Sequence, residues 1–146
     1  MLVEAIYQIL INDSGVKALL TPRTDGTTGV FPGLAPEEIA PPFIVIQQVS
    51  ARPVTSFDGN NAFQEASFQF SCIASNFLTA HKLSNAVKNA LSGIIGNYGN
   101  GGSPVVFTRI EGAWLDTERD LPTEEALHAT LYSCQADFSF HFVDLG

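Results

Sequence analysis

The chain has 146 residues, of which 45% are apolar and only 15% are charged, and its formal net charge is −8. This length fits one domain with its own core, so we expect residues 1–146 to form a single domain. The seven basic residues are scattered. That pattern disfavours sequence-specific nucleic-acid binding and contact with anionic membranes, since both need clustered positive charge.

Few targeting or redox signals are present. The sequence has no run of about 18 apolar residues, so we predict no membrane-spanning helix. Residues 1–5 contain Glu4 and no basic residue, which argues against a secretory signal. Cys72 and Cys134 match no zinc-binding or CxxC spacing, and we therefore expect buried, reduced thiols.

The N-terminal part is predicted to be helical and then irregular. Apolar residues three and four apart predict a helix over 2–12, and Asp13 or Ser14 can cap a short second helix. Residues 21–42 contain five prolines and three glycines, a density that leaves room for only very short elements such as Val30-Phe31. So long an irregular segment predicts a functional loop or one that lies along a partner.

Two strand pairs are predicted, separated by a helix. Strands over 43–50 and 62–74 are joined through a turn signal, which predicts a hairpin with a protruding tip. A helix begins after Ser75 or Asn76 and ends near Ser92-Gly93. The second pair covers 104–115 and 127–143, and the phenylalanines alternating along its last strand predict core.

The element order is helix, two strands, helix, two strands. Strands that alternate between apolar and polar residues predict an antiparallel sheet with one apolar face, which helices must cover. We therefore predict an α+β two-layer sandwich, with a four-stranded antiparallel sheet and two main helices on one face.

Several motifs, taken in order and spacing, resemble the phage tail-completion family, also described as tail terminator or tail-to-head joining proteins. These motifs are Leu2–Tyr7, Phe31–Gly33, Pro42–Val45 with Gln47, Val49-Ser50, Asp58-Gly59, Phe70–Ala74 and Trp114–Leu121. The resemblance covers nearly the whole chain, with departures in the Gly/Asn-rich stretch 96–103 and in the acidic segment 116–125.

The resemblance implies a structural role without enzymatic chemistry. Members of this family assemble as a ring, commonly sixfold, at the head-proximal end of the tail. They stop polymerisation of the tail tube and present a docking surface to the head. The implied partners are further copies of the chain, the tail tube protein and a head–tail connector or stopper protein. The implied location is the virion tail, assembled in the bacterial cytoplasm.

Two segments are candidates for subunit contacts. The acidic stretch 116–125 is predicted to be a loop, and it can be a solvated loop, a metal site or a charged contact in which Arg119 pairs with an acid of a neighbour. Phe57 at the hairpin tip either anchors a contact or folds back under the hairpin. The candidate interface residues are Phe57, Asp58, Gly59, Asn60, Asp116, Glu118, Arg119 and Asp120.

No constellation in the sequence predicts catalysis, a cofactor or a metal. His81, His128 and His141 are dispersed and lie in no nucleophile motif. The stretch 96–103 follows a helix and precedes a strand, the reverse of a phosphate-binding loop, and we predict a flexible connection there. Two alternatives stay open: another neck component, such as a head-completion or stopper protein, and a small-molecule-binding α+β domain, which needs a pocket with convergent polar groups.

Overall fold

A computed structural model describes residues 1–21, 23–36, 39–53, 63–126 and 129–145. Within these residues the chain forms three α-helices and six β-strands. In chain order they are α1 (Leu2–Asn12), α2 (Ser14–Leu20), β1 (Val30–Pro32), β2 (Phe43–Pro53), β3 (Gln64–Ala74), α3 (Phe77–Leu91), β4 (Gly96–Gly99), β5 (Phe107–Ala126) and β6 (Ala129–Asp144). No helix in the described part of the chain is both long enough and apolar enough to cross a membrane.

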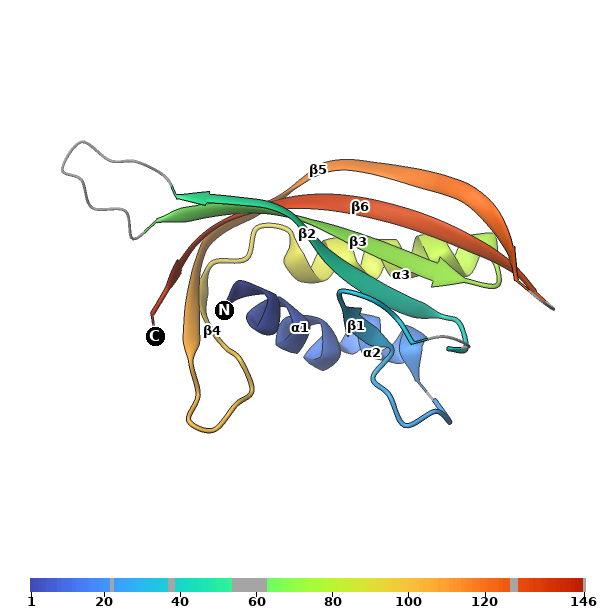
Figure 1. Ribbon diagram of the computed structural model, residues 1–146, viewed down its shortest axis with the longest axis horizontal. Helices are drawn as coiled ribbons and strands as arrows, with labels where there is room; N and C mark the ends of the chain where they lie inside the picture. The colour runs from blue at the N-terminus through green and yellow to red at the C-terminus, as the bar shows by residue number, and fades with distance from the viewer. Residues whose placement is uncertain (22, 37–38, 54–62, 127–128, 146) are drawn as a thin grey trace.

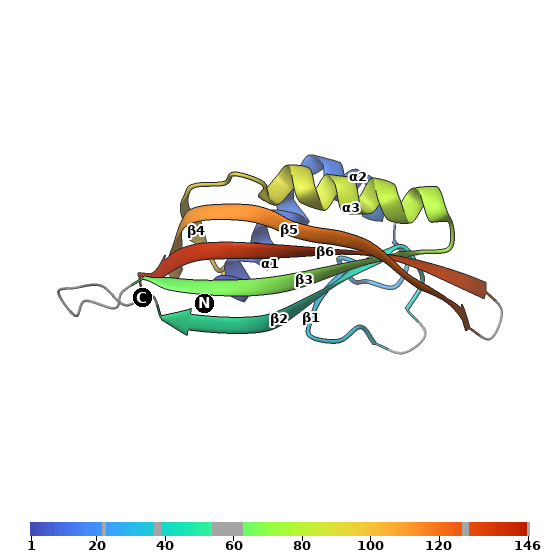
Figure 2. The same ribbon diagram turned by 90° about the horizontal axis from the view of Figure 1, so that it is seen from above.

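The six strands form one mixed sheet in the order β1-β2-β3-β6-β5-β4. β1 runs parallel to β2, and the other neighbours are antiparallel. The sheet curves as a half-barrel, and all three helices lie on its concave side (Figure 1). Seen from above, α3 runs along the sheet on the side of β5 and β6 (Figure 2).

The predicted four-stranded antiparallel sandwich with two main helices is therefore wrong. The sheet gains β1 from the proline-rich segment and β4 from the Gly/Asn-rich stretch predicted to be a flexible connection. These strands have three and four residues, too few to show an alternating pattern, and their pairing with β2 and β5 defines them instead. The short α2 is the third helix.

The predicted helices are confirmed, with their caps. α1 has the predicted bounds. The side chain of Asp13 accepts a hydrogen bond of 3.0 Å from the amide of Val16 and caps α2. Asn76 caps α3 through the amide of Leu78 at 2.8 Å. α3 ends at Leu91, and Gly93 then takes a φ of 72°, a left-handed conformation that glycine adopts without strain.

The core lies between the concave face of the sheet and the helices. Phe68 and Phe70 of β3 and Phe138 and Phe140 of β6 have no exposed surface. Their rings meet edge-to-face across the strand pair, with centroids 5.8 Å apart for Phe68–Phe140 and for Phe70–Phe138. Helix side chains including Leu10, Leu83 and Leu91 close this cluster. The prediction that the phenylalanines of the last strand are core is confirmed.

The convex face of the sheet has a different composition. Alternate residues of the same strands point there, and no helix or strand of the described chain packs on this face (Figures 1 and 2). Its side chains are mostly neutral and polar, among them Gln47, Ser67, Gln69, Ser71, Gln135, Asp137 and Ser139. The helices thus cover one face of the sheet only.

The proline-rich segment is tied to the body of the protein by Arg23. Its guanidinium pairs with Asp25 at 2.8 Å and donates hydrogen bonds to the carbonyl oxygens of Ala40, at 2.9 Å, and Pro42. Hydrogen bonds from Arg23 and from Thr27 hold the pKa of Asp25 well below its usual range. Contacts within the chain therefore help to hold this segment in place, and its role as a functional or partner-binding loop stays a prediction.

Candidate functional site

The predicted interface residues fall into two groups. Phe57, Asp58, Gly59 and Asn60 lie outside the described residues, so their contact role stays a prediction. Asp116, Glu118, Arg119 and Asp120 lie on β5, and the prediction of a loop over this stretch is wrong. A strand alternates its side chains between two faces, so these four residues divide between the concave and convex sides.

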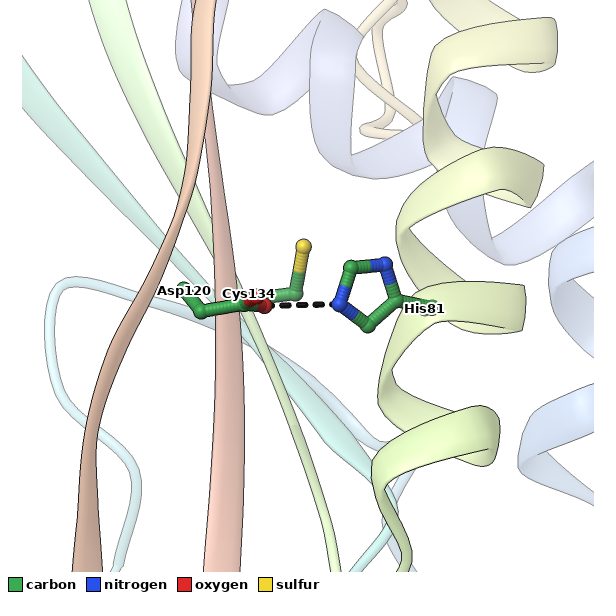
Figure 3. Close-up of side chains that lie close together, drawn as sticks. All are labelled: His81, Asp120 and Cys134. Atoms are coloured by element: carbon green, nitrogen blue, oxygen red, sulfur yellow. Dashed lines mark hydrogen bonds and ion pairs between the residues drawn. The ribbon is translucent and has the colours of Figure 1, made fainter.

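Glu118 and Asp120 face α3. Glu118 Oε2 lies 2.5 Å from Lys88 Nζ, and Asp120 Oδ1 lies 2.7 Å from His81 Nε2. Cys134 Sγ is 3.5 Å from Glu118 Oε1, to which it can donate. Figure 3 shows His81 reaching from α3 towards Asp120 and Cys134 on the adjacent strands. These two carboxylates therefore bind α3 to the sheet.

Arg119 faces the convex side and joins a polar network across three strands. Its Nη1 lies 2.9 Å from Asp137 Oδ2, and its Nη2 donates to the side-chain carbonyl of Gln135. Gln135 Nε2 in turn donates to Ser71 Oγ at 3.2 Å. The acid that Arg119 meets in this structure is thus Asp137 of its own chain, whereas one of the three interpretations of this stretch paired Arg119 with an acid of a neighbour. The Arg119 side chain is still 41% exposed.

Asp116 sits at an irregularity of β5. The register between β5 and β6 shifts between Leu115 and Thr117, which leaves Asp116 without an opposing residue. Its carboxylate accepts a hydrogen bond from Ser139 Oγ of β6. The adjacent Trp114 and Leu115 are both about 40% exposed, and Trp114 packs edge-on against His141 with ring centroids 4.8 Å apart. β5 therefore carries an exposed aromatic, an exposed aliphatic and a guanidinium side chain within six residues.

The outer edge of β5 is open over most of its length. β4 pairs with β5 only from Phe107 to Ile110, and within the described residues no strand pairs with β5 on that side farther along. One further carbonyl, that of Ala113, accepts a hydrogen bond from the amide of Gly93. Three register shifts and several acidic side chains lie along this strand. In natural sheets, bulges and charged side chains of this kind prevent an edge strand from pairing with unrelated chains. We missed this edge from sequence because we predicted a loop.

β5 and β6 also extend beyond the rest of the sheet. The last pair between β3 and β6 is Ala74 with Tyr132, whereas β5 and β6 stay paired to Ala126 and Ala129. The two strands therefore project as a two-stranded arm, residues 121–126 and 129–131, past β3 and α3 (Figure 2).

The two cysteines are free and buried, as predicted. They oppose each other across β3 and β6. Burial is the main cause that raises the pKa of Cys134 to about 11, and the nearby Glu118 and Asp120 carboxylates raise it further. Burial also raises the pKa of Cys72. Both groups are therefore neutral thiols near pH 7.

A hollow of about 530 Å³ lies between α1 and β4. Its lining includes Gln8, Asn97 and Tyr98, and among the described residues that line it Asp13 alone is charged. Polar side chains make up half of the ten lining residues, with Asn12 beside Gln8, Asp13, Asn97 and Tyr98, so the small-molecule alternative stays open at this hollow.

Comparisons with known proteins match a protein family and solved structures. The family model described as tail completion protein gp17 matches residues 4–94, which is more than half of the chain. A chain in the virion of a native gene transfer agent particle has a similar structure, with a TM-score of 0.68. The two chains are 22% identical, and the alignment covers 97% of this chain and 94% of that one. A comparison with curated protein sequences gave no match.

Proposed function

This chain belongs to the tail completion protein gp17 family, and we propose that it is one subunit of a closed ring that ends the tail tube and joins it to the head. The family match carries the proposal, because it spans α1 to α3 and includes the three strands β1, β2 and β3. Membership makes the chain a structural protein of the virion tail. The ring, its position at the head-proximal end and the joining role are the proposed part.

A closed ring needs two different contact patches on each subunit, since every copy meets the next one head to tail. An open sheet provides two such sides. β1 forms one edge, and the outer edge of β5 with β4 forms the other. We propose that the open edge of β5, with Asp116, Arg119 and the exposed Trp114, forms one of the two patches.

The opposite patch is proposed to include the tip between β2 and β3, with Phe57, Asp58, Gly59 and Asn60. Glu118 and Asp120, the other two candidates, contact α3 in the isolated subunit. We therefore propose that they position β5 and that Asp116 and Arg119 touch the neighbour.

The proposed partners are further copies of the chain, six in a closed ring, with the tail tube protein on one side and a head–tail connector or stopper protein on the other. A net charge of −8 supports protein partners over sequence-specific nucleic acid, because phosphate binding needs clustered positive charge. We propose no catalytic role. The charged residues of β5 form ion pairs and hydrogen bonds within the chain; they are Asp116, Glu118, Arg119 and Asp120.

The proposal is tested by negative-stain microscopy of particles assembled without this chain, scoring tail length and head attachment. A terminator role predicts overlong, irregular tails beside filled heads that lack tails. Tails of normal length that fail to attach would identify another neck component instead. Normal infectious particles would refute a role in assembly. Supplying the chain from a plasmid should restore tail length, which controls for effects on neighbouring genes.

A further inference from the structure

Three side chains from three elements bring potential metal ligands together beside α3. His81 comes from α3, Asp120 from β5 and Cys134 from β6 (Figure 3). One nitrogen, one carboxylate oxygen and one sulfur atom, each from a different one of these residues, all lie within 4.8 Å of one another. We propose that these residues bind one divalent transition-metal ion of the zinc class. This inference does not rest on the proposed ring.

The donor set matches the coordination chemistry of zinc. Zn²⁺ binds cysteine sulfur at about 2.3 Å and histidine nitrogen or carboxylate oxygen at about 2.0–2.2 Å, usually in a tetrahedron. His81 Nε2 and Asp120 Oδ1 are hydrogen-bonded at 2.7 Å. A tetrahedral ion in place of the hydrogen between them would widen this gap to roughly 3.4 Å. The carboxylate can make this move, since the Asp120 side chain is 51% exposed.

A buried hydroxyl provides an independent observation at the same place. Ser84 has no exposed surface, and its Oγ has no hydrogen-bond partner among the described residues. Ser84 lies one turn after His81 on α3, beside the Cys134 thiol. A buried polar atom without a good partner costs free energy, and a neutral thiol is only a weak acceptor for this hydroxyl. A bound metal thiolate would accept its hydrogen bond.

The local charge also favours a cation. Two carboxylates lie beside the Cys134 thiol, since Glu118 Oε1 is 3.5 Å from its Sγ and Asp120 belongs to the cluster, and Lys88 pairs with Glu118. A divalent ion would replace repulsion between these groups with attraction. Metal binding then deprotonates the thiol and releases its proton to solvent.

A small cavity gives the site a route to solvent. It has a volume of about 110 Å³ and is lined by Phe77, Ala80, His81, Asp120, Leu121, Tyr132 and Ser133. The ring of Phe77 packs against that of His81 at a centroid distance of 4.5 Å and restrains its orientation. With three protein ligands, the fourth position of the ion would face this cavity, where a water molecule or a partner's side chain can bind.

The sequence predicted no metal site because the three ligands are far apart in the chain. His81 and Asp120 are 39 positions apart, and neither shares a short spacing with Cys134. The fold brings them together at the base of the β5–β6 arm. A metal ion bound there would link α3 to both strands from which the arm extends.

Cobalt binding tests the proposal, because Co²⁺ reports its ligands by absorption. The full-length protein, reduced and stripped with a chelator, is titrated with Co²⁺ without oxygen. We expect one equivalent to bind, with visible bands of tetrahedral cobalt and a near-ultraviolet thiolate-to-cobalt band, all lost when Zn²⁺ is added. Zn²⁺ should also raise the melting temperature, and a chelator should reverse that rise.

Matched variants identify the ligands. His81→Ala and Asp120→Asn should weaken Co²⁺ binding at least tenfold, and Cys134→Ser should abolish the thiolate band. His141→Ala and Cys72→Ser should bind as the unchanged protein does, since His141 and Cys72 are the remaining described histidine and the other cysteine. If Cys134→Ser does not fold, His81→Ala carries the test, with circular dichroism as the check on folding.

Three results would overturn the proposal: no stoichiometric binding, binding without a thiolate band, or equal affinities for His81→Ala and His141→Ala.

Discussion

The concave and convex faces of the sheet are built from alternate residues of the same strands, yet they differ in almost every respect. Phe68 on the concave side has no exposed surface, and its neighbour Ser67 on the convex side is partly exposed. The concave face is closed by three helices and accounts for the fold. The convex face carries serines, glutamines and the Arg119–Asp137 pair, and no described helix covers it.

In a protein without an obvious active site, function is best sought where the composition of a surface is not explained by the core. Burial of the phenylalanines explains why the concave face has its composition. Nothing in the core requires the convex network of Arg119, Gln135 and Ser71, or the open edge of β5 beside it. Those features have a reason if another protein meets them, as the proposed ring requires.

The largest expected effect separates the two faces directly. Phe68→Ala should lower the free energy of unfolding by about 3–5 kcal/mol, because it opens a cavity among rings in contact. Ser67→Ala, one residue away on the other face, should change it by no more than about 0.5 kcal/mol. Urea unfolding of both variants measures the contrast. Similar losses for the two variants would show that the convex face is also a structural requirement.

A smaller effect should come from the buried thiols at alkaline pH. Cys134 ionises at an ordinary pKa of 9.0 when unfolded and at about 11 when folded. The unfolded state therefore releases the proton first, and the stability that this thiol contributes is full below pH 9 and lost as the pH rises to about 11. We expect a loss of up to about 2 kcal/mol.

Urea midpoints at pH 8, 9 and 10 measure this loss, with Cys134→Ser as the control for other groups that titrate there. A slope with pH that is the same in both proteins would contradict the assignment to Cys134.

Removing the N-terminal cap of α3 should lower the free energy of unfolding by about 1 kcal/mol. Asn76 Oδ1 accepts hydrogen bonds from the amides of Leu78 at 2.8 Å and Thr79 at 3.3 Å, and Asn76→Ala leaves both amides without this partner. Ser75→Ala is the matched control, since Ser75 was the other cap candidate and the structure assigns the cap to Asn76. In thermal and urea unfolding, Asn76→Ala should be less stable than Ser75→Ala. The reverse order of stability would refute this cap.

The smallest effect on stability, and the sharpest test of the convex face, concerns Arg119. Arg119→Ala removes a half-exposed ion pair and should cost no more than about 1 kcal/mol. If Arg119 contacts the neighbour, the variant should nevertheless be lost from assembled tails. Arg109→Ala is the control, because Arg109 is an exposed, ion-paired arginine near the other end of the same strand. Equal incorporation of the two variants into tails would remove Arg119 from the proposed interface.

Much of the fold was predictable where a periodic pattern of apolar residues ran over many positions. The alternation of Phe138, Phe140 and Phe142 predicted a half-buried strand, and the helical spacing in residues 2–12 predicted α1 with its bounds. β1 and β4 were not predictable in this way, because strands of three and four residues show no period. The family resemblance was confirmed by the match over residues 4–94.

The candidate site was less accessible to sequence reasoning. The acidic residues from Asp116 onward lowered the apparent strand propensity, and register shifts broke the alternation, so a twenty-residue strand was predicted to end at residue 115. The contact of His81 with Asp120 depends on how α3 crosses the sheet, which no local pattern encodes. Charge singled out residues 116–120 as interface candidates, a role that stays a prediction, and no sequence pattern predicted their division between two faces of the sheet.

The most direct test of the central proposal is an electron microscopy reconstruction of isolated tails from particles that contain this chain. We predict a closed ring of copies of the chain at the head-proximal end of the tail tube, with the open edge of β5 at each subunit boundary. A chain found at the opposite end of the tail, or present there without a closed ring, would contradict the proposed function.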